Sequence, residues 1–188
     1  MPYFWVTIPI LFNFRYSDKG SSYNEEGNAE SLILEVIDLE TEFLYVNYLS
    51  QGIGNNDLGL DRGKIGDQQI VYFQKAGNKL LLIQPNLGFR ATTNNELEKA
   101  SVEQAFGKSV LFGFPILGET KKGYEIDLTP FLMHDVFNVA GELKASKQGD
   151  YSFDESRSAL NMDRTKAFPN NVEFEAIVTL KGKPKGDK

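Results

Sequence analysis

The sequence predicts a single α+β domain built mainly from an antiparallel β-sheet, with about two helices inserted among the strands. Three observations lead to this prediction. Short apolar segments rich in β-branched and aromatic residues follow one another along the 188-residue chain. Only two segments show the helical spacing of apolar residues. The strand–helix–strand alternation of a parallel sheet does not recur, so the strands are expected to pair antiparallel.

The composition is that of a folded globular domain. Hydrophobic residues make up 41% of the chain and charged residues 24%. The 14 Phe and 8 Tyr residues favour a sheet, because aromatic side chains pack well on pleated surfaces. The net charge of -6 argues against a nucleic-acid partner, which requires a basic surface. The absence of cysteine excludes disulfides, thiolate nucleophiles and Cys-ligated zinc.

The apolar beginning of the chain, "MPYFWVTIPILFNFRY", is predicted to be a strand. A signal peptide needs a basic region before its apolar run, and Pro9, Asn13 and Arg15 interrupt the run too early for a membrane helix, so no membrane span is expected. A degenerate export signal is the alternative. The polar stretch that follows has little to bury, and residues 1–31 are therefore assigned as an atypical N-terminal strand and a flexible loop.

The clearest local signal is the pair "QIVYFQK" and "KLLLIQP" around "AGN". Gly77 and Asn78 can adopt the positive φ angles of a two-residue hairpin turn. The resulting register pairs Tyr72 with Ile83 and Phe73 with Leu82. Before this hairpin, "LILEVID" and "EFLYVNYLS" have apolar residues on both faces, which predicts central strands.

Two segments predict helices. In "TTNNELEKASVEQAFGKS", Thr93 and Glu96 have capping-box spacing and Gly107 ends the pattern. The apolar stripe of this helix is Leu97, Ala100, Ala105 and Phe106. In "TPFLMHDVFNVAGELKAS", Thr129 is the expected N-cap and Pro130 the first helical residue. The stripe of this second helix is Leu132, Val136, Val139, Ala140 and Leu143.

The segment "NVEFEAIVTL" alternates as a strand with one solvated face. Its buried face is predicted to hold Val172, Phe174, Ala176, Val178 and Leu180. Its solvent face is predicted to hold Glu173, Glu175 and Thr179. Residues 181–188, "KGKPKGDK", have no apolar content and are predicted to be a linker or tail.

The sequence predicts no catalytic residue and no cofactor or metal site in this chain. The single histidine, His134, lacks the pattern of a catalytic triad, and one histidine without cysteine argues against zinc. A boundary position on a helix is the simpler interpretation. Carboxylates are numerous, and one weaker hypothesis is a hydrolase that uses two of them across a cleft. For Glu173 and Glu175, the solvated face of a strand is the favoured interpretation.

The glycine-rich stretch "GIGNNDLGLDRGKIGDQQ", residues 52–69, lies between two predicted strands. It contains neither a Walker loop nor a dinucleotide-binding fingerprint. Asn55, Asn56, Asp57, Asp61 and Asp67 are suitable calcium ligands, but their spacing does not match an EF-hand. A connection rich in turns and held by Asp and Asn side chains is favoured over calcium binding.

Several ordered blocks resemble one known family. They are "TEFLYVNYLSQGIGNNDLGLDRGKIGDQQIVYFQKAGNKLLLIQPNLGFRA", "SVEQAFGKSVLFGFPI", "IDLTPFLMHD", "GDYSFDESRSALN" and "RTKAFPNNVEFEA". Together they resemble the domain of unknown function found N-terminal to the catalytic region in bacterial zinc-dependent metalloproteases. The resemblance covers residues 32–180, which it marks as a metalloprotease-associated β-rich domain.

The resemblance implies a non-catalytic accessory module of a secreted zinc metallopeptidase. In that family an H-E-x-x-H motif in a separate domain binds the zinc, and this chain contains no such motif. The implied partner is the metalloprotease catalytic domain, in the same polypeptide or as a separate fragment. The implied location is periplasmic, cell-envelope or extracellular.

The loop is then expected to dock the neighbouring domain through Asp57, Asp61, Arg62 and Asp67, with Arg62 pairing bidentately with a carboxylate. The alternative is a free-standing domain that binds a peptide, a glycan or a protein. That alternative rests on exposed aromatic side chains such as Tyr3, Phe4 and Trp5.

Overall fold

The structure is a computed structural model that describes residues 3–9, 31–53, 56–168 and 171–186. Within these ranges the chain forms a ten-stranded sheet, all of whose pairings are antiparallel, and a separate two-stranded sheet. The large sheet contains β10 (Lys166–Ala167), β11 (Asn171–Ile177), β1 (Tyr3–Pro9), β3 (Phe43–Gln51), β4 (Ile65–Ala76), β5 (Lys79–Gln84), β6 (Ser109–Glu119), β7 (Tyr124–Asp127) and β2 (Ile33–Val36), in that order, with β9 (Ala159–Leu160) also paired to β11. The small sheet pairs β8 (Gly149–Phe153) with β12 (Leu180–Pro184). The predicted antiparallel sheet is thus confirmed.

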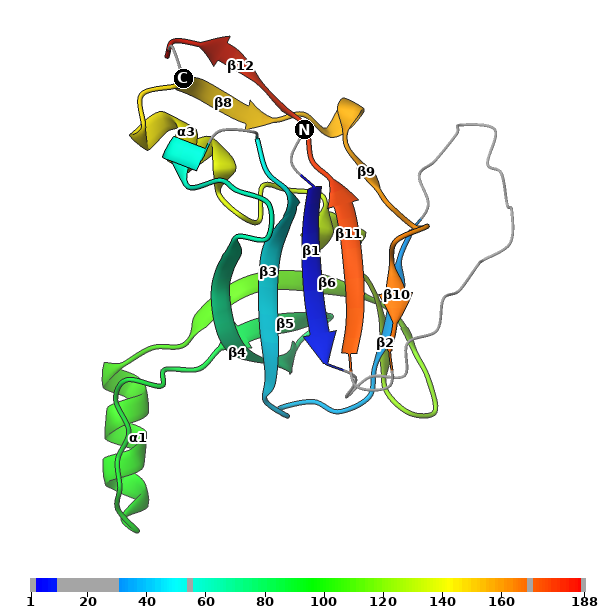
Figure 1. Cartoon of the computed structure of the whole chain (residues 1–188). Coiled ribbons are helices and arrows are strands. Elements are labelled where there is room, and N and C mark those ends of the chain that lie inside the picture. Colours follow the sequence, from blue (N-terminus) through cyan, green and yellow to red (C-terminus); the bar gives the residue numbers. More distant parts are fainter. Residues whose placement is uncertain (1–2, 10–30, 54–55, 169–170, 187–188) are drawn as a thin grey trace.

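The large sheet curls around the larger of two buried apolar clusters found among the described residues (Figure 1). Leu34 in β2 belongs to the same buried cluster as Phe174 in β11, although these strands lie toward opposite ends of the sheet. Phe73 and Phe114 meet at the centre of this cluster, with ring centroids 5.9 Å apart. Burial of these large apolar side chains is the main source of stability for a domain of this kind.

The predicted hairpin is confirmed in its register. Tyr72 pairs with Ile83 and Phe73 with Leu82. The turn differs in one respect from the prediction, because only Gly77 has a positive φ, of 60°. A two-residue turn with glycine at its first central position needs no positive φ at the second, so Asn78 keeps an ordinary backbone.

The first predicted helix exists as α1 (Glu96–Ala105), but two details of its prediction are wrong. The N-cap is Asn95, whose side-chain oxygen accepts a hydrogen bond from the Leu97 amide at 3.0 Å. Thr93 instead accepts a bond from the Asn95 amide. No residue of α1 is buried, and Leu97 is 81% exposed, because the helix projects away from the sheet (Figure 1).

The second predicted helix is two short helices, α2 (Thr129–Leu132) and α3 (Val139–Ala145). Asn138, at the start of α3, has a left-handed backbone with φ of 56°, which breaks the helical path. Thr129 does not cap α2. Its hydroxyl accepts a hydrogen bond from the Leu32 amide at 2.9 Å and so fixes the segment that leads into β2. Short 3-10 helices occupy Asn56–Leu58 and Glu155–Arg157.

Two strands differ from the prediction of central positions with both faces apolar. β3 alternates between buried and accessible residues, and Leu44 is 42% exposed. β2 is the last strand of the sheet. Its buried Glu35 accepts a hydrogen bond from the Thr120 hydroxyl at 2.6 Å, so one polar position is satisfied inside the protein.

The N-terminal segment belongs to the large sheet. β1 lies between β3 and β11, which joins the N-terminal segment to the rest of the domain. Residues 17–30 of the predicted N-terminal loop and the side chains of Tyr3, Phe4 and Trp5 lie outside the described part of the chain. The C-terminal segment 181–188 was predicted to be a linker or tail, but the structure places its first residues in β12.

Candidate functional site

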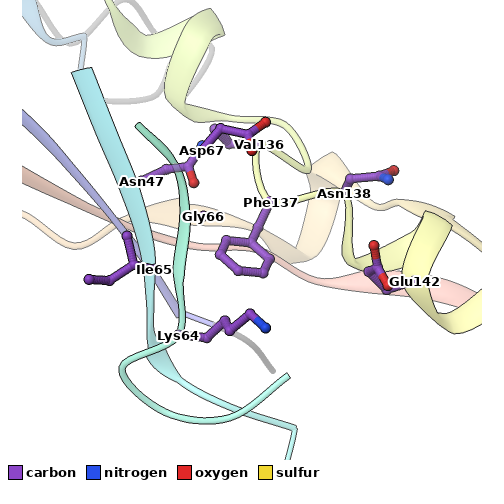
Figure 2. A pocket seen from close by; sticks show the side chains of 9 residues that line it. All are labelled: Asn47, Lys64, Ile65, Gly66, Asp67, Val136, Phe137, Asn138 and Glu142. Carbon is purple, nitrogen blue, oxygen red and sulfur yellow. The ribbon is translucent and has the colours of Figure 1, made fainter. Parts of the chain in front are cut away.

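A pocket of about 320 Å³ lies between the start of β4 and the segment that joins α2 to α3 (Figure 2). The sheet contributes Asn47, Gly66 and Asp67 to its lining. The helical side contributes Phe137, Asn138 and Glu142. The pocket therefore joins one end of the glycine-rich stretch to a segment more than sixty residues away in sequence.

A β-bulge forms the sheet side of the pocket. In the β3–β4 pairing Val46 faces Gln68 and Tyr48 faces Ile65, so the single residue Asn47 faces two residues, 66 and 67. A bulge bends its strand and re-aims the neighbouring side chains. Strand β4 begins at Ile65, so residues 65–69 of the predicted loop belong to the sheet.

Gly66 is required here because the backbone meets two side chains at close range. A Cβ atom at this position would overlap the Asn47 Oδ1 atom and would lie 2.9 Å from Cε2 of Phe137. Only glycine leaves room for both neighbours. The glycine thus lets Phe137 pack directly over the bulge.

Asn47 is 5% exposed, and its Oδ1 atom has no hydrogen-bond partner among the described residues. Its Nδ2 group donates a hydrogen bond to the Tyr45 hydroxyl at the long distance of 3.5 Å. Burial raises the pKa of Tyr45 to about 12, so this phenol stays protonated at neutral pH. Figure 2 shows the Asn47 amide on the Phe137 side of β3. A buried acceptor without a partner costs free energy.

The other wall is held in place by Asp135. Its two carboxylate oxygens accept hydrogen bonds from the Val139 and Ala140 amides at 2.8 and 2.7 Å. These bonds tie the connecting segment to the first turn of α3. Phe137 is consequently presented to the bulge from a fixed backbone, as Figure 2 shows.

Three charged side chains lie at the rim: Lys64, Asp67 and Glu142. All three residues are exposed, and two of them are acidic. At neutral pH the rim therefore has one excess negative charge. The pocket lining also includes the aromatic ring of Phe137 and the side chain of Asn47.

Of the four predicted docking residues, the pocket lining includes Asp67. Asp57 is exposed on the short 3-10 helix that follows the loop's undescribed residues 54–55. Asp61 is half-buried, with an Oδ1 atom that has no hydrogen-bond partner among the described residues. Arg62 is exposed, and the ion pairs found among the described residues do not include it.

Sequence reasoning missed Asn47, Phe137 and Glu142. A signal for Asn47 was present, because it occupies the same alternating position in "FLYVNYLS" as the buried Phe43, Tyr45 and Leu49. A polar residue at an inward-facing position of a strand needs an explanation. Phe137 and Glu142 gave no comparable signal, since only the tertiary fold brings them to β4.

A second polar cluster surrounds Glu175 on β11. This residue was predicted to be solvated, yet its exposed fraction is 0%. Its carboxylate accepts hydrogen bonds from Ser50 Oγ at 2.8 Å and Asn161 Nδ2 at 2.6 Å, and it forms an ion pair with Arg164 Nε at 3.2 Å. The segment 161–165 covers this face of β11, which is why the prediction of a wet face fails here.

Two aromatic side chains have shifted pKa values. The pKa of Tyr48 is raised to about 12 by burial and by the nearby charges of Glu173 and Glu175. Burial lowers the pKa of His134, which lies against Phe131 at a ring distance of 5.7 Å. The Nδ1 atom of His134 is buried without a hydrogen-bond partner in the described structure.

In the described ranges, no three His, Cys, Asp or Glu side chains form a group that could hold a metal ion. No helix in the part of the chain that the structure describes is long and apolar enough to cross a bilayer.

Comparison with known proteins identifies one family. Residues 63–188, more than half of the chain, match the family described as Domain of unknown function (DUF5117), and the chain belongs to that family. The match includes Gly66 and Asp67 of β4, the helical side of the pocket and α1, whereas Asn47 on β3 lies before it. No curated protein and no solved structure matches the chain significantly.

Proposed function

We propose that this chain is a non-catalytic accessory module that docks onto the catalytic region of an exported zinc metallopeptidase, in the same polypeptide or as a separate fragment. The first support is the resemblance of its ordered sequence blocks to the domain that precedes such catalytic regions. The second is that the 188-residue sequence has one histidine and therefore no H-E-x-x-H motif of its own. The peptidase chemistry is assigned to the partner.

The observation that carries the docking proposal is the arm formed by α1 and its two flanking connections. The helix has 10 residues and buries none of them, although isolated helices of this length are marginal in water. Beside it the rings of Phe89 and Phe106 stack with centroids 4.0 Å apart, and both side chains are exposed. Leu97 is a third exposed apolar side chain of this arm, and exposed apolar side chains of this kind can anchor a protein interface.

A second candidate function is a free-standing domain that binds a small ligand or a peptide. The pocket at the β4 bulge favours it, because its volume is in the range of ligand sites and its lining includes an aromatic ring and charged side chains. The two candidates differ in what they need. The accessory module requires a peptidase region as its partner, and the free-standing domain does not.

The proposal is tested by determining the coding sequence on both sides of this segment and producing any H-E-x-x-H region found there. Calorimetric titration of that region with this chain is expected to show saturable binding. Leu97→Ser and Phe106→Ser should each weaken binding about tenfold, as expected for anchor residues. Leu117→Ser is the matched control, because Leu117 is also an exposed apolar residue but lies on β6.

Three outcomes count against the accessory role. One is a coding locus without an H-E-x-x-H region. Another is the absence of binding to such a region when it exists. The third is zinc-dependent peptidase activity of the purified chain alone.

A further inference from the structure

We infer that His134 makes the attachment of the α2–α3 segment, residues 129–145, sensitive to acid, so that protonation of its ring below neutral pH releases this segment from the sheet. Phe137 and Glu142 of this segment line the pocket at the β4 bulge. Acidification should therefore open the helical wall of the pocket while the sheet stays folded. The device requires no partner, and its test is independent of the accessory role.

The first step is the surroundings of the ring. His134 is half-buried, and its ring centroid lies 5.7 Å from that of Phe131 in α2 and 6.4 Å from that of Phe112 in β6. Its Nδ1 atom is buried and has no hydrogen-bond partner among the described residues. Both ring nitrogens of a protonated histidine are donors. The charged ring therefore has a buried N–H group for which the packed segment provides no well-formed hydrogen bond.

The second step is the charge around the ring. The residues that face it from β6 and α2 are the uncharged Phe112 and Phe131. Phe131 in turn contacts Tyr45 of β3, which is also neutral because burial raises its pKa to about 12. The Asp135 carboxylate and the backbone of α2 favour the charged ring. Burial outweighs them and holds the pKa of His134 below its ordinary value of 6.5.

The third step is the direction of the pH effect. Because the pKa of the packed ring is lowered, a released ring binds a proton more readily than the packed one as the pH falls below about 6.5. The stabilisation by the packed neutral ring is complete above that pH and is lost toward the lowered pKa. Local release is favoured here because α2 and α3 are short and Asn138, with φ of 56°, interrupts the helical path between them.

The test uses the fact that His134 is the only histidine of the chain, so one ring C–H signal in the NMR spectrum reports its titration. The midpoint is expected below pH 6.5. Amide hydrogen exchange is then compared at pH 7.5 and 5.0, after correction for the intrinsic pH dependence of exchange. At the lower pH, exchange of residues 129–140 should accelerate at least about threefold relative to β11, which corresponds to half a unit of pKa difference.

Two variants remove the titrating group. His134→Phe keeps a ring in the apolar site and cannot bind a proton, so exchange of residues 129–140 should be the same at both pH values. His134→Gln is the second variant, which keeps the test decisive if the larger ring disturbs folding, and it should lose the pH response as well. Glu103→Gln on α1 is the matched control and should keep the native response, since Glu103 is exposed on another element.

The inference is overturned by a midpoint at or above pH 6.5, or by exchange in residues 129–140 that rises no more than in β11. It is also overturned if both His134→Phe and His134→Gln keep the native pH response. A lowered midpoint with uniform acceleration across the whole chain would contradict it too, because His134 would then govern global stability and not the attachment of this segment.

Discussion

Helix α1 and strand β11 both differ from their predicted amphipathic patterns, and they differ in opposite ways. No residue of α1 is buried in the described structure, and Leu97 is 81% exposed. The predicted wet face of β11 is instead covered at Glu175 by the segment 161–165. Periodicity thus predicts which element forms, but the rest of the chain decides which face is covered.

Glu175 on β11 contributes to stability, whereas the exposed apolar side chains of α1 are suited to recognition. The covered carboxylate of Glu175 is bound by three side chains from other segments, so it belongs to the interior. The apolar side chains of α1 contribute almost nothing to the fold by themselves. An uncovered apolar surface is typical of an interaction site. Substitutions at the two places should therefore differ in what they change.

The largest expected effect is at Glu175. Glu175→Ala removes the partner of Ser50, Asn161 and Arg164 and should lower the free energy of unfolding by about 3 kcal/mol. Chemical denaturation measures this change. Glu173→Ala, on the same strand but only partly buried, is the control and should cost less than about 1 kcal/mol. Equal costs would contradict the distinction between a covered and a wet carboxylate.

A second covered position is Gly66, where Phe137 packs on the sheet. Gly66→Ala forces the new Cβ atom against Asn47 and Phe137, and it should cost roughly 1–3 kcal/mol through overpacking. Gly107→Ala is the control, because a Cβ atom there meets nothing within 4 Å. Thermal unfolding of both variants measures the difference. A neutral effect of Gly66→Ala would show that Phe137 does not hold this wall.

The stability that Asp154 contributes to the folded chain should depend on pH. Asp154 accepts hydrogen bonds from Ser156 Oγ and Arg157 Nε, and these bonds hold its pKa below the ordinary value of 3.8. Because the folded pKa is lowered, the stabilisation is complete above about pH 4 and is lost as the pH falls further. Asp154→Asn should therefore lower stability at neutral pH, with a difference that shrinks in acid. A constant difference from pH 7 to 2 would contradict this linkage.

The smallest effect on stability is expected for Leu97→Ser on α1. Its side chain is exposed in the isolated chain, so the free energy of unfolding should change by less than about 0.5 kcal/mol. The same substitution should clearly weaken docking. A large loss of stability would show that α1 is packed in solution, which would remove the basis for a docking arm.

Sequence patterns predicted the local elements well. The hairpin register around Gly77 is correct because cross-strand pairs follow directly from turn length. Val172 and Phe174 are buried as their alternation predicted. The break between α2 and α3 was not predictable from spacing alone, since Asn138 can occupy either a helical or a left-handed backbone.

The candidate site was only partly predictable. Asp67 was selected for its loop, and the structure does place it at the pocket. The bulge that creates the pocket depends on a register shift between β3 and β4, which no local pattern shows. Phe137 and Glu142 reach it only through the α2–α3 segment. Residues joined by tertiary contacts of this kind are found from the fold and not from spacing.

Helix α1 is the proposed docking surface for a peptidase catalytic region. Hydrogen–deuterium exchange of this chain, measured with and without the H-E-x-x-H region, tests this proposal. In the free chain the amides of α1 should exchange rapidly, because few buried contacts protect them. In the presence of the catalytic region the same amides should become protected, while β11 remains unchanged. Unchanged rapid exchange in α1 under saturating catalytic region would contradict the claim.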